Sequence, residues 1–269
     1  MIRTVPVAAR AAWVLVVLGT AGCAGFRAAP PPSGVPVPLA ADDPLLAVLV
    51  DGWTHTLESR TSLRSGVVLK LSGPEGDRRL NQNVVLARPA RLRMEIQAFL
   101  TTAAVLVADG SRYDYFQSLN RYRESGPVHP LLLWQIAGVP LTLEQAVHFL
   151  LGGPPPRPGL HRAAGERLPD GSVTVELEDA AGRRVRSLRF TPQGPLGQVE
   201  EWSPDGRLRW RVGYDRYREV GGQPFAHTIE FEFPRYESRA TVAFRSVELN
   251  PATPDRLFEL HVSGEEGAD

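Results

Sequence analysis

Alternating apolar and polar residues, the pattern of a half-buried β-strand, recur along most of the chain. Apolar side chains take every second position in residues 92–96, 173–177, 208–214 and 229–233. The residues between them are mostly arginine, glutamate or threonine. Because successive side chains of a strand point to opposite faces of its sheet, each segment predicts a strand with one apolar and one wet face.

Turn-forming residues separate these segments, among them the pairs Asp109-Gly110, Asp170-Gly171 and Asp205-Gly206. Asp-Gly pairs suit tight hairpins because both residues tolerate a positive φ. We count about eleven short strands joined mainly by hairpins, which predicts a single antiparallel sheet.

Helical spacing of apolar residues appears in two places. Residues 44–60 carry leucine, valine and tryptophan at helical intervals, with Asp42 and Asp43 as candidate caps and Pro44 suited to a first turn. The second place, residues 127–158, interrupts the strand pattern and predicts two short helices, the latter capped by Thr142. A curved sheet with one apolar face can bury these helices on its concave side. We therefore expect a mainly β fold, an incomplete, half-open β-barrel with an α-helical lid.

The amino terminus has the pattern of a bacterial lipoprotein signal. Arg3 and Arg10 precede an apolar run at residues 11–21, and Cys23 follows small residues. The run is shorter than the ~20 residues of a bilayer-spanning helix. We expect acylation of Cys23 after removal of residues 1–22; the alternative is an ordinary signal cut near Ala24 or Ala29. Since alanine rather than aspartate follows the cysteine, bacterial sorting rules favour the outer membrane.

The remaining chain divides into a linker, a domain and a tail. Residues 23–43 are rich in proline and small residues, which predicts a semi-extended spacer. Residues 44–262 hold the strand and helix patterns, and we expect residues 263–269 to be a disordered tail. The chain has one cysteine, so an internal disulfide is impossible and stability must come from the core.

Charge and motif content exclude several classes of function. Thirty acidic and thirty basic residues give no net charge, which argues against nucleic-acid binding. The six histidines lack metal-ligand spacing, so we expect no metal site. No nucleophile elbow or phosphate-binding glycine loop is present, and we expect neither catalytic residues nor a cofactor.

Residues 88–95 read RPARLRME, residues 109–116 read DGSRYDYF, and residues 120–122 read NRY. These short segments resemble the core signature of the LolA and LolB lipoprotein carriers. Near the carboxyl end, residues 247–251 and 255–260 resemble the closing strand and tail of that superfamily. The order of elements and the helical insertion agree over residues 44–262.

This resemblance implies a half-barrel around a hydrophobic cavity that takes acyl chains, with the helices as a lid. It implies that Arg88 contacts the lid. An acylated member is similar to LolB, in which an apolar residue protrudes on a loop; residues 97–102 match that loop, which makes Phe99 and Leu100 candidates for membrane insertion. The alternative is that a strand runs through and buries both.

The half-barrel also makes the inward-facing strand residues candidates for lipid binding. The alternative is that these side chains only fill a core. The candidates are Leu92, Met94, Ile96, Val105, Val107, Trp210, Val212, Phe231 and Phe233.

Together these features predict a non-enzymatic lipoprotein of the outer membrane, facing the periplasm, that binds acyl chains of lipids or lipoproteins and helps deliver them to that membrane. Expected partners are acyl chains and the membrane, with a periplasmic carrier protein as a candidate donor, and the protein is expected to be a monomer. The alternative is a structural or assembly lipoprotein with a filled interior. A hydrolase would require a buried nucleophile beside a histidine.

Overall fold

The computed structural model describes residues 34–74, 76–98 and 101–260. The predicted signal peptide, Cys23, the loop residues Phe99 and Leu100, and the predicted tail lie outside these ranges. Helices and strands follow one another along the chain as β1 (Val37–Ala40), α1 (Pro44–Glu58), β2 (Ser62–Ser72), β3 (Arg78–Ala87), β4 (Arg91–Ala98), β5 (Thr101–Ala108), β6 (Arg112–Gln117), β7 (Tyr122–Pro127), α2 (Leu132–Ala137), α3 (Leu143–Leu150), β8 (His161–Arg167), β9 (Val173–Glu178), β10 (Arg184–Phe190), β11 (Leu196–Trp202), β12 (Leu208–Val220), β13 (Gln223–Phe233), η1 (Pro234–Tyr236), β14 (Ser238–Phe244), β15 (Glu248–Leu249) and η2 (Asp255–Phe258).

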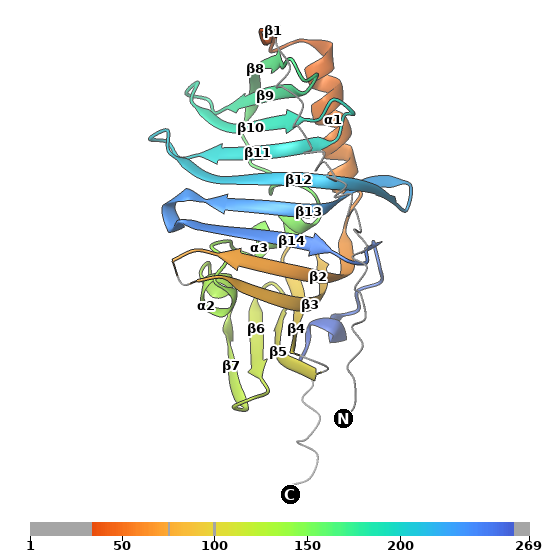
Figure 1. The fold of residues 1–269 in the computed structure, drawn as a ribbon, viewed down its shortest axis with the longest axis vertical. Coiled ribbons are helices and arrows are strands. Elements are labelled where there is room, and N and C mark those ends of the chain that lie inside the picture. Colours follow the sequence, from red (N-terminus) through yellow and green to blue (C-terminus); the bar gives the residue numbers. More distant parts are fainter. Residues whose placement is uncertain (1–33, 75, 99–100, 261–269) are drawn as a thin grey trace, which may run out of the picture. The chain divides into compact units, whose positions relative to one another are not determined.

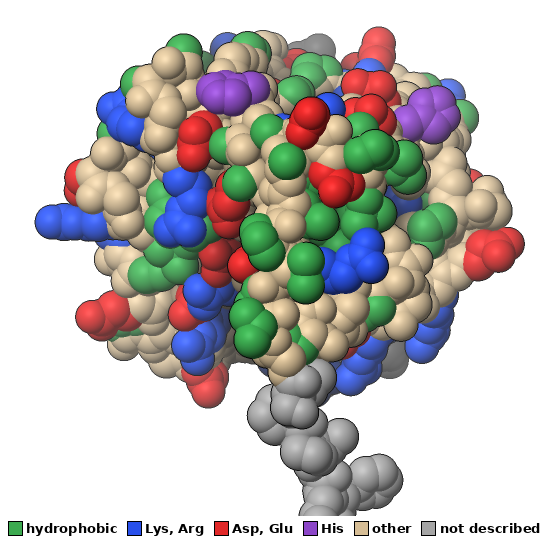
Figure 2. Space-filling model, turned by 90° about the horizontal axis from the view of Figure 1, so that it is seen from above, with side chains coloured by type: hydrophobic (Ala, Val, Ile, Leu, Met, Phe, Trp, Pro, Cys, Tyr) green, Lys and Arg blue, Asp and Glu red, His purple; other side chains and the backbone are tan. Residues whose placement is uncertain are grey.

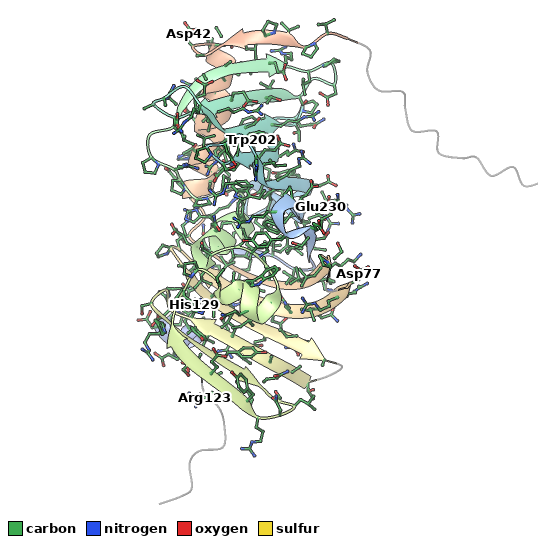
Figure 3. All side chains as sticks on the ribbon, turned by 90° about the vertical axis from the view of Figure 1, so that its left-hand side faces the viewer. Asp42, Asp77, Arg123, His129, Trp202 and Glu230 are labelled. Atoms are coloured by element: carbon green, nitrogen blue, oxygen red, sulfur yellow. The ribbon has the colours of Figure 1, made fainter. Side chains whose placement is uncertain are left out.

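One antiparallel sheet contains all the strands (Figure 1). Its order is β1-β8-β9-β10-β11-β12-β13-β14-β2-β3-β4-β5-β6-β7, with the short β15 also paired to β2. Within the described residues β1 and β7 are the two edges, and they do not pair with each other. In Figure 3 these edges lie at opposite ends of the sheet, marked by Asp42 beyond β1 and Arg123 on β7. The predicted open, mainly β fold with a helical lid is confirmed.

The sheet has more strands than the sequence pattern predicts, 15 in the described part of the chain against about eleven expected. Strand β15 has two residues, too few to show alternation. Strand β1 lies in the predicted spacer and pairs with β8, from Val37 opposite Arg167 to Ala40 opposite Ala164. Pro38 is tolerated there because an edge strand can leave one side of its backbone unpaired. The expectation that residues 37–40 form only a spacer is therefore corrected.

Helices α1 and α3 begin where capping chemistry predicts. The Asp43 side chain accepts a hydrogen bond from the backbone N–H of Leu45 at 2.8 Å, and Pro44 opens α1. Thr142 and Gln145 form a reciprocal capping box at α3. Gly138, with a φ of 70°, ends α2 in the left-handed conformation.

All three helices of the described chain contribute to one hydrophobic core with the sheet. Helix α1 runs across the strands, from Leu46 beside Gly165 of β8 to Ser59, whose hydroxyl lies 3.4 Å from the Gln223 side chain of β13. Helices α2 and α3 cover the middle of the sheet (Figure 1). The sheet thus has two covers on its inner face, α1 over one part and α2–α3 over another.

Candidate functional site

Beneath α2 and α3 the structure contains a small apolar cavity of about 80 Å³. Strands β2, β3, β4, β13 and β14 form its floor, and the two helices form its roof. Its lining consists of Val67, Leu69, Gln82, Val84, Leu92, Met94, Leu133, Ala137, Val139, Leu141, Ala146, Leu150, Phe231, Ala240, Val242 and Phe244. We call α2 and α3 the lid, because they close this space.

Three of the nine predicted lipid-binding residues, Leu92, Met94 and Phe231, line the cavity. Their strands reach it by register: Val84 of β3 is opposite Met94 of β4, and Phe231 of β13 is opposite Ala240 of β14. Ile96 shares this face, since its partner Gln82 also lines the cavity, but it lies half-buried beyond the lining.

Val105 and Val107 lie on the opposite face of the sheet. They pair with Glu95 and Arg93, whereas Leu106 pairs with the cavity residue Met94. The sequence of β5 does not show which of its side chains point inward. Apolar residues fill successive positions, because side chains on both faces of this strand are buried or half-buried. On the outer side the helical turn η2 contacts β4 and β5. The inward face of β5 is carried instead by Leu106 and Ala108, which the sequence interpretation missed.

Trp210, Val212 and Phe233 are buried on the inner face but outside the cavity lining. Phe149 of the lid contacts the ring of Trp210 edge-on, with centroids 4.9 Å apart, and Phe231 stacks on Phe233 at 6.0 Å. Trp210 and Phe233 also border a separate open groove of about 830 Å³ near η1. These aromatic rings separate the cavity from that groove.

Arg88 lies where the lid meets α1. Its guanidinium donates hydrogen bonds to the backbone carbonyls of Arg60 and Leu57, at 2.9 and 3.0 Å. The third contact, 3.2 Å long, is with Nδ1 of His148 on α3. His148 is 4% exposed, and burial together with the charge of Arg88 lowers its pKa to about 4. The imidazole is therefore neutral at pH 7 and can accept the Arg88 N–H.

A second arginine, Arg60, anchors the same carboxyl end of α3. It donates to the carbonyls of Leu151, at 2.9 Å, and Pro224, at 2.6 Å, and its charge lies over the Phe225 ring. Burial lowers the pKa of this guanidinium. Arginine suits a carbonyl at a helix carboxyl end, where the backbone dipoles concentrate negative charge. Neither Arg60 nor His148 was expected from the sequence, since Arg60 lies in a polar segment and a single histidine among apolar residues gives no sign of its partners.

The inner face of strands β8 to β12 is largely apolar, but one row across it contains buried charges. Register places Arg162, Leu177, Arg186, Glu201 and Trp210 in one row across these strands. We call this row the charged row. Glu201 accepts charge-assisted hydrogen bonds from Arg186 at 2.7 Å, Arg209 at 3.1 Å and Arg157 at 3.3 Å.

The central ion pair of the charged row is buried, with the Arg186 and Glu201 side chains 6% and 5% exposed. The segment after the lid covers it, since Pro155 accepts a further hydrogen bond from Arg186. Burial lowers the pKa of Arg186, although Glu201 opposes the shift. Hydrocarbon would not replace these contacts, so the charged row is unsuited to an acyl chain.

Residues 34–74, 76–98 and 101–260 contain no group of three histidine, cysteine or acidic side chains that could hold a metal ion. No helix in these ranges combines the length and apolarity required to cross a bilayer. On the face seen in Figure 2, acidic, basic and hydrophobic side chains are interspersed.

Comparison with solved structures identifies the fold. A LolA superfamily protein from Nitrosomonas europaea matches with a TM-score of 0.54 and 14% identity, over 79% of this chain and 97% of that one. An outer membrane lipoprotein-sorting protein domain from Vibrio parahaemolyticus matches with a TM-score of 0.55 and 8% identity, over 78% and 94% of the two chains. A DUF1329 family protein from Desulfovibrio piger gives 0.53 and 9%, over 79% and 96%.

The chain thus has the fold of the LolA superfamily, as the resemblance of its motifs predicted. No protein-family model matches the sequence, and no curated protein matches it. At these identities the likeness concerns the fold alone.

Proposed function

We propose that this protein is an acyl-chain receptor, a non-enzymatic lipoprotein anchored in the outer membrane through Cys23. Acyl chains of lipids or lipoproteins would enter the space beneath the lid and leave it for the membrane. Each buried methylene contributes ~0.8 kcal/mol, so a chain can be held without any covalent step. A periplasmic carrier protein would be the donor.

The main observation in support of this proposal is the cavity. Its lining is apolar at nearly every position, and two short helices form its roof. At about 80 Å³ it is smaller than the ~300–1,000 Å³ of most small-molecule sites. An acyl chain therefore requires the lid to move away from the sheet. The closed arrangement supports a resting state in which the lid side chains occupy the place of the ligand.

The attachment of the lid supports such a movement. Polar contacts of Arg88 and Arg60 hold α3 at its buried His148 and at the carbonyl of Leu151. Gly138, between α2 and α3, and Gly152, after α3, have positive φ values of 70° and 114°, which allow the chain to turn sharply between the two helices and out of the lid. The lid is thus a separate segment joined to the sheet by side chains.

The competing function is a structural lipoprotein, and the small volume of the cavity favours it. In that case the lid would stay closed and the interior would never take a ligand. Close packing is normal for protein cores, which contain few voids larger than a water molecule. Binding measurements separate the two functions.

The test compares two alanine-to-leucine substitutions on β14. Ala240→Leu adds three carbons inside the cavity, whereas Ala243→Leu adds them on the other face of the same strand. An environment-sensitive fluorescent fatty acid should bind the wild-type protein and Ala243→Leu with equal affinity, and Ala240→Leu at least tenfold more weakly. No saturable binding to any of the three, with all folded by circular dichroism, would favour the structural role.

Delivery to the membrane can be tested in cells. Leu100→Glu would place a charge on the proposed insertion loop, and other lipoproteins should then accumulate in the periplasm. Normal delivery in this variant would remove the loop from the mechanism.

The lipid anchor can be tested separately. Cys23→Ser should release the protein from the outer membrane, and an unchanged membrane fraction would contradict the anchor.

A further inference from the structure

Gln82 is the one polar residue among the described side chains that line the cavity. It is 5% exposed, and its side-chain Nε2 has no hydrogen-bond partner. A buried amide without a partner costs about 1–3 kcal/mol. Such groups are rare in folded proteins, and each requires an explanation. A binding partner that is absent from the resting state is one explanation.

The position of Gln82 on β3 indicates how a ligand would lie. Leu80, Gln82, Val84 and Leu86 are successive inward positions on this strand. Leu86 is fully buried and Leu80 is half-buried, so exposure rises towards Leu80. On the neighbouring strand Ile96, opposite Gln82, is also half-buried. Gln82 therefore stands between the apolar floor of the cavity and its rim.

A ligand with an apolar tail and a carbonyl group fits this arrangement. The tail would contact Val84, Met94 and their neighbours, and the carbonyl oxygen, at the start of the tail, would lie level with the Gln82 amide. The amide N–H₂ donates and a carbonyl oxygen accepts. A pure hydrocarbon would leave the amide unsatisfied.

We infer that Gln82 donates a hydrogen bond to the carbonyl oxygen of a bound acyl ester or amide and so selects acyl chains over alkyl chains. The inference rests on the proposed function, since it names the chemical class of ligand for the same cavity. Gln82 acts as a specificity residue, comparable to polar groups in other sites that reject a ligand lacking their hydrogen-bond partner.

Two glycerolipids that differ only in this carbonyl provide the test. 1-Palmitoylglycerol has an ester carbonyl, and 1-hexadecylglycerol has an ether in its place. Both would displace the fluorescent fatty acid from the full-length protein carrying Cys23→Ala, so that no acyl group of its own competes. We expect the ester to bind about five- to tenfold more tightly than the ether, as one hydrogen bond provides.

Gln82→Leu should abolish this preference and bring the ester-to-ether ratio near one. Gln82→Met is a second variant of similar length, in case leucine disturbs packing. Asn83→Leu is the matched control, because Asn83 is exposed on the other face of β3 and should keep the wild-type ratio.

The outcomes are distinct. Equal wild-type affinities for ester and ether, or a preference that survives in both Gln82 variants, would overturn the role of Gln82 while leaving the cavity as a binding site. Failure of the fatty acid and of both glycerolipids to bind the wild-type protein would overturn the proposed function and this inference together.

Discussion

The lid and the segment that follows it cover two different kinds of surface on the inner face of the sheet. Beneath the lid, strands β13, β14 and β2 to β4 offer hydrocarbon and a single amide. Beneath the segment after the lid, strands β8 to β12 offer the charged row, in which Glu201 joins three arginines. Both surfaces belong to the same sheet, so topology alone does not determine what each part can hold.

This difference indicates which of the two surfaces can exchange its contacts for those of a ligand. An apolar surface is non-directional, and hydrocarbon from a ligand can replace hydrocarbon from the lid at little cost. The charged row depends on specific partners at 2.7 to 3.3 Å, and opening it would leave buried charges uncompensated. We therefore expect the charged row to remain closed while the lid moves.

The largest expected effect is from breaking the charged row. Glu201→Gln removes the negative charge that compensates Arg186, and stability should fall by about 3–5 kcal/mol. Urea denaturation measures this loss. Glu200→Gln, at a partly exposed pair with Arg211 on the other face of β11, is the control and should cost less than about 1 kcal/mol.

A double replacement tests whether charge compensation explains this loss of stability. Arg186→Met combined with Glu201→Leu removes both charges and should recover most of the lost stability. A double variant as unstable as Glu201→Gln would show that the row contributes something other than charge compensation.

Lowering the pH should destabilise the fold through His148 of the lid. The pKa of His148 is about 4 in the fold, below its ordinary value near 6.5, so between these values the unfolded state binds more protons. Stability should therefore fall by about 2–3 kcal/mol as the pH decreases from 7 to 4, because a proton on His148 would face the charge of Arg88.

Unfolding curves across this pH range, for the wild type and for His148→Gln, measure the contribution of His148 by difference. His55→Gln is the matched control, because His55 is exposed on α1. The same pH dependence in wild type and His148→Gln would contradict the assignment.

Several of these features could be predicted from the sequence and others could not. Alternation and turn residues predicted the antiparallel sheet, apolar spacing predicted the helices, and capping residues marked the starts of α1 and α3, because these signals are local. Strand β1 was missed, since its pairing with β8 joins segments more than 120 residues apart. Val105 and Val107 were placed on the wrong face, because a strand buried on both sides has no readable parity.

The polar members of the interior were the hardest to predict. Gln82 and Arg60 lie among polar residues in the sequence and His148 lies among apolar ones, so no local signal marks the three as buried. Only the register of β3 and the packing of α3 show that they are buried.

A smaller effect is expected at the capping box of the lid. Thr142→Ala removes the hydroxyl that accepts the backbone N–H of Gln145 and should weaken α3 by about 1 kcal/mol. Stopped-flow binding of the fluorescent fatty acid should then be up to about fivefold faster, because the open lid is more populated. Thr142→Ser should restore the wild-type rate, and an unchanged rate in Thr142→Ala would separate lid stability from ligand access.

The most direct test of the apolar cavity uses its methionine. The chain has two methionines, Met1 and Met94, and Met94 lines the cavity. With ¹³C-methyl-methionine and saturating 1-palmitoylglycerol, nuclear Overhauser contacts should join the Met94 methyl group to the methylenes of the chain. A Met94 signal that keeps its free position, with no contact to the ligand, would contradict acyl binding beneath the lid.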